Sequence, residues 1–143
     1  MMHNETEIKS QRTPNAKILI VNECDEDLLY HSEILKTQGY EVESCTSYME
    51  GKARSHREAF DLVLVSQGTP AFEGSGVLVS ATARDRDARV VVLARSANMK
   101  CYLEAMQLGA VDYVEGPFTS SEIFKLVEWH VRRRGRTSDG ALE

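Results

Sequence analysis

The sequence predicts an α/β fold in which a parallel sheet is covered by helices on both faces. Four short apolar runs indicate strands: KILIV (17–21), DLVLV (61–65), RVVVL (89–93) and VDYV (111–114). They are rich in Val and Ile and do not alternate with polar residues, which is typical of strands buried on both faces. Helical segments separate them, and this alternation predicts right-handed crossovers. Any site should then lie at the carboxyl ends of the strands.

The segment after the first strand has the features of a helix that ends at a glycine. Residues 26–38 precede Gly39, a favourable residue just after a helix. A weaker fifth strand, YEV (40–42), follows directly. Residues 48–58 carry a poor apolar stripe, so a helix is expected there from the alternation of strands and helices rather than from its own pattern.

Three more helices are expected in the second half of the chain. Residues 75–86 have only a partial apolar stripe, and that helix again rests on the alternation. Residues 97–108 stop at Gly109, as the first helix stops at its own glycine. The helix 119–134 begins with a Thr and a Glu at capping-box spacing, and its apolar residues recur every four positions. This last segment has the clearest helical pattern.

Length and composition fit one ordinary globular domain. The chain has 143 residues, of which 42% are apolar and 27% are charged, and its net charge is −5. We expect a domain over 16–134 between flexible termini, an N-terminal arm (1–15) and a C-terminal tail (135–143). The acidic balance and the position of RRRGR (132–136) at a helix end make a nucleic-acid partner unexpected. No membrane span or secretory signal is recognisable, so a cytoplasmic protein is expected.

The cysteines and the loop after the first strand give weaker indications. Cys24, Cys45 and Cys101 are widely spaced without a C-x-x-C pair, so buried thiols are expected rather than disulfides or a zinc site. Cys24 lies in the acidic loop NECDED (22–27), where carboxylates disfavour a thiolate and hence a redox role. This loop repels phosphate and suits a cation, although its later acids are also favourable at a helix start.

Four motifs, in matching order and spacing, resemble the receiver domains of bacterial two-component response regulators. KILIVNE resembles the first strand with its acidic pair, and DLVLVSQGTP resembles the strand that carries the phosphoacceptor aspartate. VVVLARS resembles the strand that ends in a switch Thr or Ser, and GAVDYVEGPF resembles the segment that ends in Lys-Pro-Phe. The resemblance covers about residues 16 to 134. It implies a flavodoxin-like, doubly wound five-stranded parallel sheet of strand order 2-1-3-4-5 with five surrounding helices.

Most of the family's active residues are replaced at the matching positions. Ser66 stands at the phosphoacceptor position, and Asn22 and Glu23 stand at the acidic pair. Ala94 replaces the switch hydroxyl, and Gly116 replaces the lysine. A serine hydroxyl is a poor nucleophile without a nearby base. Glu23 is the one acid left at a matching position, so Mg²⁺ binding should be weak or absent.

The resemblance and these replacements together predict a pseudo-receiver, which has the fold without the phosphotransfer. We expect a module that is not an enzyme, needs no cofactor, and acts in two-component, phosphorelay-type signalling through protein contacts. A histidine kinase, a transcription factor or a second copy of the chain would be its partner. Two alternatives remain open: a receiver phosphorylated unconventionally, for example on Ser66, and a pseudo-receiver that senses a small molecule.

Three residues are candidates for a switch or an interface. Tyr113 stands where receivers carry an aromatic that moves between buried and exposed positions, although it could simply be a partly covered strand residue. Trp129 lies off the apolar stripe of the last helix, so it either anchors a contact or covers its own neighbours. With Lys100 it would belong to the face of the fourth helix, fifth strand and fifth helix, through which a homodimer could form. His31 is expected at the edge of the core.

Overall fold

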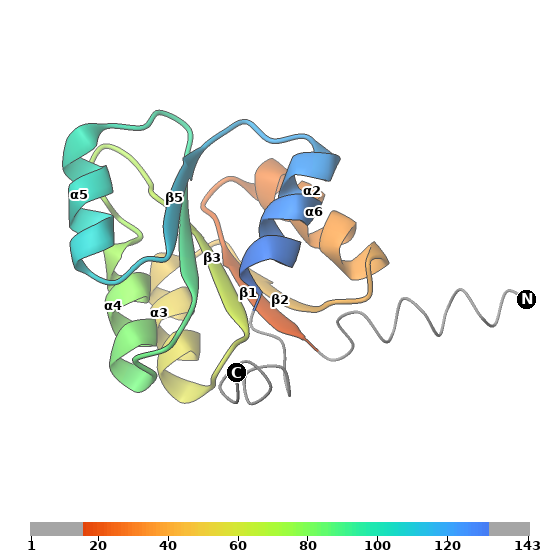
Figure 1. Ribbon diagram of the computed structural model, residues 1–143, viewed down its shortest axis with the longest axis horizontal. Coiled ribbons are helices and arrows are strands. Elements are labelled where there is room, and N and C mark those ends of the chain that lie inside the picture. Colours follow the sequence, from red (N-terminus) through yellow and green to blue (C-terminus); the bar gives the residue numbers. More distant parts are fainter. Residues whose placement is uncertain (1–15, 132–143) are drawn as a thin grey trace, which may run out of the picture.

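Five parallel strands form the centre of the molecule, and helices cover both faces of the sheet (Figure 1). The computed structural model describes residues 16–131. The strands are β1 (Lys17–Val21), β2 (Glu41–Cys45), β3 (Leu62–Ser66), β4 (Val90–Ala94) and β5 (Asp112–Glu115). Their order is β2-β1-β3-β4-β5, and all four neighbouring pairs are parallel. The flavodoxin-like sheet expected from the sequence is therefore confirmed.

Five helices are present within the described residues. They are α2 (Asp25–Thr37), α3 (Tyr48–Arg57), α4 (Ser75–Arg84), α5 (Met99–Gln107) and α6 (Ser120–His130). Helices α2 and α6 lie on one face of the sheet, and α3, α4 and α5 lie on the other (Figure 1). Within residues 16–131, no helix is both long and apolar enough to cross a membrane.

The apolar runs of the strands supply both layers of the core. Successive side chains of a strand point to opposite faces. In β1, accordingly, Leu19 and Val21 pack with α3, α4 and α5, whereas Ile18 and Ile20 pack with α2 and α6. All four side chains have 0% exposure. A strand that is covered on both sides needs apolar residues at every position, which is why these runs do not alternate.

Several helix ends follow from local residues. Gly39 and Gly109 directly follow the C-cap residues of α2 and α5. They adopt positive φ angles of 97° and 103°, a conformation that costs glycine little. The capping box predicted for the last helix is present, because Thr119 accepts from the backbone N–H of Glu122 and the Glu122 side chain accepts from that of Thr119. These local stop and start signals account for most of the predicted boundaries.

Other predicted boundaries differ from the structure. Helix α5 starts at Met99 rather than at residue 97, because the side chain of Asn98 caps it by accepting from the backbone N–H of Cys101 at 2.8 Å. Helix α6 ends at His130, and the backbone of the next residue, Val131, is extended. The predicted residues 132–134 of that helix, the arm 1–15 and the tail 135–143 lie outside the described residues. The weak strand predicted over 40–42 is β2, which is longer and begins one residue later.

The packing of helix α3 explains why its sequence has a poor apolar stripe. Its buried residues are small, Gly51 and Ser55, and not large and apolar. A Cβ atom at Gly51 would lie 2.6 Å from a methyl carbon of Val21, so the glycine allows α3 to approach β1 closely. The hydroxyl of Ser80 on α4 donates to the Lys52 carbonyl of α3 at 3.0 Å. The α3–α4 layer is thus held by close backbone approach and polar contacts that hydrophobic periodicity does not reveal.

Candidate functional site

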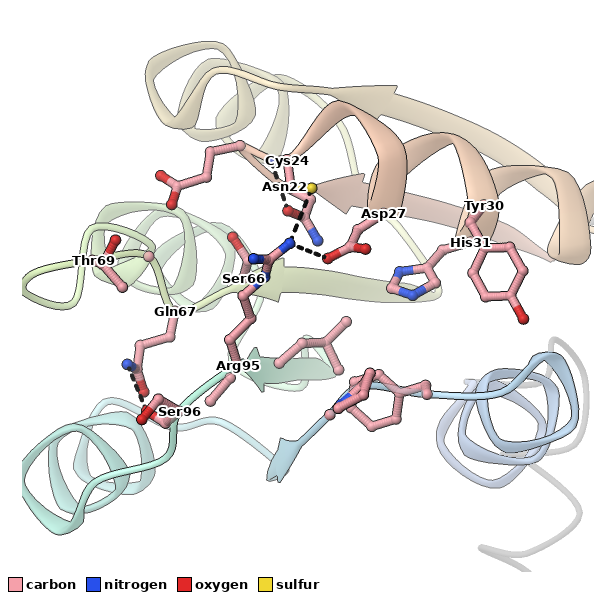
Figure 2. A pocket seen from close by; sticks show the side chains of 17 residues that line it. Asn22, Cys24, Asp27, Tyr30, His31, Ser66, Gln67, Thr69, Arg95 and Ser96 are labelled. Carbon is pink, nitrogen blue, oxygen red and sulfur yellow. Dashed lines mark hydrogen bonds and ion pairs between the residues drawn. The ribbon is translucent and has the colours of Figure 1, made fainter.

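The carboxyl edge of the sheet brings the five predicted pocket residues together. Asn22 and Glu23 follow β1, Ser66 ends β3, Ala94 ends β4 and Gly116 follows β5. All five line one cavity of about 800 Å³, which Figure 2 shows from close by. The cavity lies between these strand ends and the first turns of α2. The five residues lie together because the carboxyl ends of parallel strands meet at one edge of the sheet.

Ser66 is engaged by a residue that the sequence did not suggest. The phenolic oxygen of Tyr48, in the first turn of α3, lies 2.5 Å from the Ser66 hydroxyl oxygen. Burial raises the pKa of Tyr48 to about 12, although the hydrogen bond to Ser66 acts in the opposite direction. A phenol with that pKa is protonated at neutral pH and does not act as a base for the serine. Tyr48 is thus a hydrogen-bond partner of Ser66 but does not activate its hydroxyl as a nucleophile.

The residues at the matching metal positions do not fit Mg²⁺. Asn22 is 6% exposed, and its side-chain oxygen accepts from the backbone N–H of Cys24 at 2.9 Å. Glu23 is the one carboxylate at a matching position, and the Ser66 oxygen is bonded to Tyr48. Among the described residues, no group of three or more His, Cys, Asp and Glu is placed to hold a metal ion. Mg²⁺ prefers an octahedral set of hard oxygens with one or two carboxylates, and this arrangement does not supply it.

The other two positions that the resemblance singled out, Ala94 and Gly116, are tightly packed. Ala94 is 2% exposed and carries no hydroxyl. A Cβ atom at Gly116 would lie 2.6 Å from a ring carbon of Phe118, so the phenylalanine ring packs directly against the glycine backbone. The Gly116–Pro117 peptide bond is cis. Without rearrangement of Phe118, a longer side chain at residue 116 has no room to extend into the cavity.

Arg95 is a cavity residue that sequence reasoning missed. It follows β4, and Figure 2 shows its side chain extending from that strand end toward α2. Its Nη2 lies 3.2 Å from a carboxylate oxygen of Asp27 and 3.1 Å from the sulfur of Cys24. The hydrogen bond to Asp27 is the main cause of a raised Arg95 pKa. In the sequence, Asp27 lies in the segment after β1 and Arg95 directly follows β4. Only the tertiary structure brings the two side chains together.

His31 lies on the α2 side of the same cavity. Its side chain is 4% exposed and lines the cavity, and its ring meets that of Phe118 edge-on at a centroid distance of 6.2 Å. Burial lowers the pKa of His31, and the nearby Asp27 carboxylate only partly opposes this effect. The ring nitrogen Nδ1 is buried without a hydrogen-bond partner among the described residues. The expectation of a histidine at the edge of the core is confirmed.

Tyr113 is held against the end of β3 by hydrogen bonds. Its hydroxyl donates to the side-chain oxygen of Gln67 and accepts from the backbone N–H of Asn98 at 3.2 Å. Burial raises the pKa of Tyr113, and its ring stands edge-on to that of Tyr102 at 5.7 Å between centroids. The ring is partly covered in this structure. Gln67 is 5% exposed and was not singled out in the sequence.

The two remaining candidates do not line the cavity. Trp129 on α6 is 82% exposed, and Lys100 on α5 is also exposed. With Tyr113 on β5, they lie on three elements around one edge of the sheet, because β5 is an edge strand with α5 and α6 on its opposite faces (Figure 1). Trp129 and Lys100 therefore lie away from the strand-end cavity, whereas Tyr113 contacts Gln67, which lines it.

Known proteins resemble both the sequence and the fold. The transcriptional regulatory protein PrrA of Mycobacterium tuberculosis is 27% identical over 127 residues, which cover 89% of this chain and 54% of PrrA. The sensory transduction protein RegX3 of the same species is 29% identical over 114 residues, which cover 77% of this chain and 50% of RegX3. The chain thus spans about half the length of these curated relatives.

Solved structures and a family model agree with these relatives. A CheY-like response regulator receiver domain protein from Methanospirillum hungatei, 25% identical, has a TM-score of 0.75 over 80% of this chain and 92% of its own. The chemotaxis protein CheY4 of Vibrio cholerae, 20% identical, has a TM-score of 0.74 over 82% of this chain and 99% of its own. The family model of the response regulator receiver domain matches residues 18–128. The chain therefore belongs to the response regulator receiver domain family, a family of signalling domains in two-component systems.

Proposed function

We propose that this receiver domain acts through protein–protein contacts without aspartyl phosphorylation and without catalysis of its own. The observation that carries the proposal is Ser66 at the end of β3, at the phosphoacceptor position, with its hydroxyl bonded to Tyr48. A serine cannot form the acyl phosphate that an aspartate carboxylate forms. The neutral phenol of Tyr48 also does not activate the hydroxyl.

The other replaced positions support the same proposal. Transfer of a phosphoryl group depends on positioned charges that stabilise the transferring oxygens. Gly116 supplies no cation, Ala94 supplies no hydroxyl, and Asn22 turns its side-chain oxygen to a backbone N–H. An acid, the cation and the hydroxyl on which phosphotransfer depends in the family are thus all absent from the matching positions.

Phosphoryl donors test this proposal directly. We expect no added mass when the chain is incubated with acetyl phosphate and Mg²⁺ and then measured by intact mass spectrometry. An active receiver domain treated in parallel is the positive control, and a Ser66→Ala variant identifies the residue if mass is added. A phosphate that is present on the wild type and absent from Ser66→Ala would support the unconventional receiver instead. A serine kinase preparation in place of acetyl phosphate extends the test to that alternative.

The surface for a partner is proposed around α5, β5 and α6. Trp129 is a large aromatic with 82% exposure, and such residues often dominate the energy of an interface. The proposed partner is a histidine kinase, a transcription factor or a second copy of the chain. Wild type and Trp129→Ala are compared in pull-downs from the source cell and in light scattering. Met49→Ala is the matched control, because Met49 is also 82% exposed but lies on α3.

A small-molecule sensor is a second candidate, and the cavity favours it. Its volume of about 800 Å³ falls in the range of ligand pockets, and polar and apolar side chains both line it. A ligand that binds only the native state raises the melting temperature by mass action. Thermal-shift screening against nucleotides and metabolites would reveal such a ligand, and a rise that Arg95→Ala abolishes would locate it in the cavity.

A further inference from the structure

Cys24 differs from the other two cysteines in its surroundings. Cys45 and Cys101 are each 6% exposed and lie in the core, whereas Cys24 is partly exposed and borders the strand-end cavity. Cys24 is also the residue that precedes the first turn of α2. The positive end of the helix dipole favours negative charge at that position.

A cation contacts the Cys24 sulfur directly. Nη2 of Arg95 donates to Sγ at 3.1 Å, and the same atom lies 3.2 Å from Asp27 (Figure 2). Cationic neighbours, helix N-termini and partial exposure are the conditions under which cysteine thiols react. The carboxylates in the sequence around Cys24 suggested an unreactive thiol, but Arg95 comes from 71 residues further along the chain.

A side chain that lines the cavity beside Cys24 carries a buried polar atom without a hydrogen-bond partner among the described residues. Nδ1 of His31 has no hydrogen-bond partner among residues 16–131, although the side chain is 4% exposed and lines the cavity. Most buried polar atoms are hydrogen-bonded, so such an atom at a cavity indicates a place for a polar ligand group. Burial lowers the His31 pKa, which favours the neutral ring, and a neutral imidazole has one nitrogen that donates a hydrogen bond and one that accepts.

We propose that Cys24 is a modification site that forms a mixed disulfide with a small, amine-bearing disulfide. The Cys24 thiolate attacks one sulfur of the disulfide R–S–S–R, a new bond forms between Cys24 and that sulfur, and the original S–S bond breaks. The other half leaves as a thiolate and takes a proton from water. Cys24 is oxidised and the leaving half is reduced, so no further oxidant is required. This proposal does not depend on whether the domain is phosphorylated.

The charges around Cys24 favour an amine on the reagent. Glu23 and Asp27 line the cavity with Arg95, so its charged side chains sum to −1, and Asp25 and Glu26 follow in the first turn of α2. This surrounding charge attracts a cationic disulfide and repels an anionic one. An ammonium group is also a hydrogen-bond donor, and Nδ1 of His31, which has no partner among the described residues, accepts a hydrogen bond in the tautomer that carries its proton on Nε2. The adduct then lies in the cavity with its sulfur at Cys24 and its amine toward α2.

Three disulfides of similar size but different charge test the proposal on the folded chain. They are cystamine (cationic), 2-hydroxyethyl disulfide (neutral) and 3,3′-dithiodipropionate (anionic). Intact mass and peptide mapping should show one adduct, on Cys24, formed fastest with cystamine and slowest with dithiodipropionate. The Cys24→Ser variant should show none. An adduct on Cys45 or Cys101 in place of Cys24, or equal rates for the three reagents, would overturn the proposal.

Two further measurements test the assigned contacts. Arg95→Ala should react with the neutral disulfide about threefold more slowly, because the variant loses the cation that contacts the Cys24 sulfur and favours its thiolate form. An unchanged rate would refute the role of Arg95. In ¹H–¹⁵N spectra of the imidazoles, assigned with His31→Gln, cystamine should shift the His31 ring nitrogens in the wild type but not in Cys24→Ser. Unshifted His31 signals on the modified wild type would refute placement of the amine in the cavity.

Discussion

Tyr48 reaches from the first turn of α3 to the end of β3. Its phenolic oxygen is hydrogen-bonded to the Ser66 hydroxyl oxygen at 2.5 Å. On the opposite side of the cavity, His31 is buried with an unpartnered Nδ1 among the described residues. The two side chains have opposite consequences. A satisfied hydrogen bond contributes to stability, whereas a buried imidazole without a partner opposes its own protonation. Both effects are measurable in single substitutions.

Replacing Tyr48 by Phe should lower the free energy of unfolding by about 0.5–1.5 kcal/mol, because the Ser66 hydroxyl loses its partner while the ring remains. Urea unfolding followed by circular dichroism measures the change. Tyr102→Phe is the matched control, because the Tyr102 side chain is 41% exposed and should tolerate the change. Equal stability of Tyr48→Phe and wild type would contradict the bond to Ser66.

His31 should make stability depend on pH near neutrality. Burial holds its pKa in the folded state below the value of 6.5 expected when unfolded, so the unfolded chain binds more protons in this range. The free energy of unfolding therefore falls as pH drops through that value and is restored above it. Urea unfolding at pH 5.5 and 7.5 should show a smaller difference for His31→Leu than for wild type. The same difference in both proteins would argue against a depressed His31 pKa.

At the scale of elements, Gln67 and Tyr113 connect the end of β3 to β5 and α5. Gln67 accepts from the Tyr113 hydroxyl, and its amide lies 3.5 Å from the carbonyl oxygen of Ser96. Asn98, the residue that caps α5, donates its backbone N–H to the same tyrosine. Tyr113 is therefore held in place by two segments, around residues 67 and 98, that are far apart in the sequence. This arrangement couples the strand-end cavity to the side of the sheet where α5 and β5 meet.

A Gln67→Ala variant should release Tyr113. We expect a loss of about 1–3 kcal/mol in the free energy of unfolding, because a buried amide and its partners lose their hydrogen bonds. The Tyr113 ring signals in NMR spectra should also shift toward those of an exposed tyrosine. Gln107→Ala on α5 is the matched control, since Gln107 is exposed. Unchanged Tyr113 signals in Gln67→Ala would show that Asn98 and packing alone hold the ring.

At the scale of the whole molecule, the receiver fold is present in the described residues, and the loss of phosphotransfer proposed here concerns residues at the strand ends. The sheet order and both core layers match the family arrangement. The burial that holds the sheet together involves residues different from those at the strand ends. Different residues at the positions of Asn22, Ser66 and Gly116 can thus change the chemistry and leave the architecture intact.

Magnesium should not stabilise the protein. A ligand at one hundred times its Kd adds about 2.7 kcal/mol to the free energy of unfolding, which would raise the melting temperature clearly. For this chain we expect a rise below about 1 °C at millimolar MgCl₂, equivalent to a few tenths of a kcal/mol. Calorimetry in NaCl of matched ionic strength is the control, and the Asn22→Asp/Ser66→Asp double variant should gain a response. A comparable rise in the wild type would show that the present residues do hold the ion.

The sequence by itself determined the strands, most helix ends and which candidate residues lie at the carboxyl edge of the sheet. Buried parallel strands need apolar residues at every position, and Gly39, Gly109 and Thr119 carry their helix signals within a few residues. The sequence therefore locates the strand ends without showing which helices and strands lie beside them. Because parallel strands share one carboxyl edge, Asn22, Ser66 and the other replaced residues could be assigned to one cavity.

Only the tertiary structure decided which side chains meet there. Arg95 contacts Cys24 and Asp27 from about 70 positions away, and Tyr48 and Gln67 find Ser66 and Tyr113 at separations of 18 and 46 residues. Such pairs leave no periodic signal, because they depend on how the crossovers pack and on which rotamers the packing allows. Helix α3 was weak in the sequence for the same reason, since its close approach to β1 depends on a glycine facing a valine.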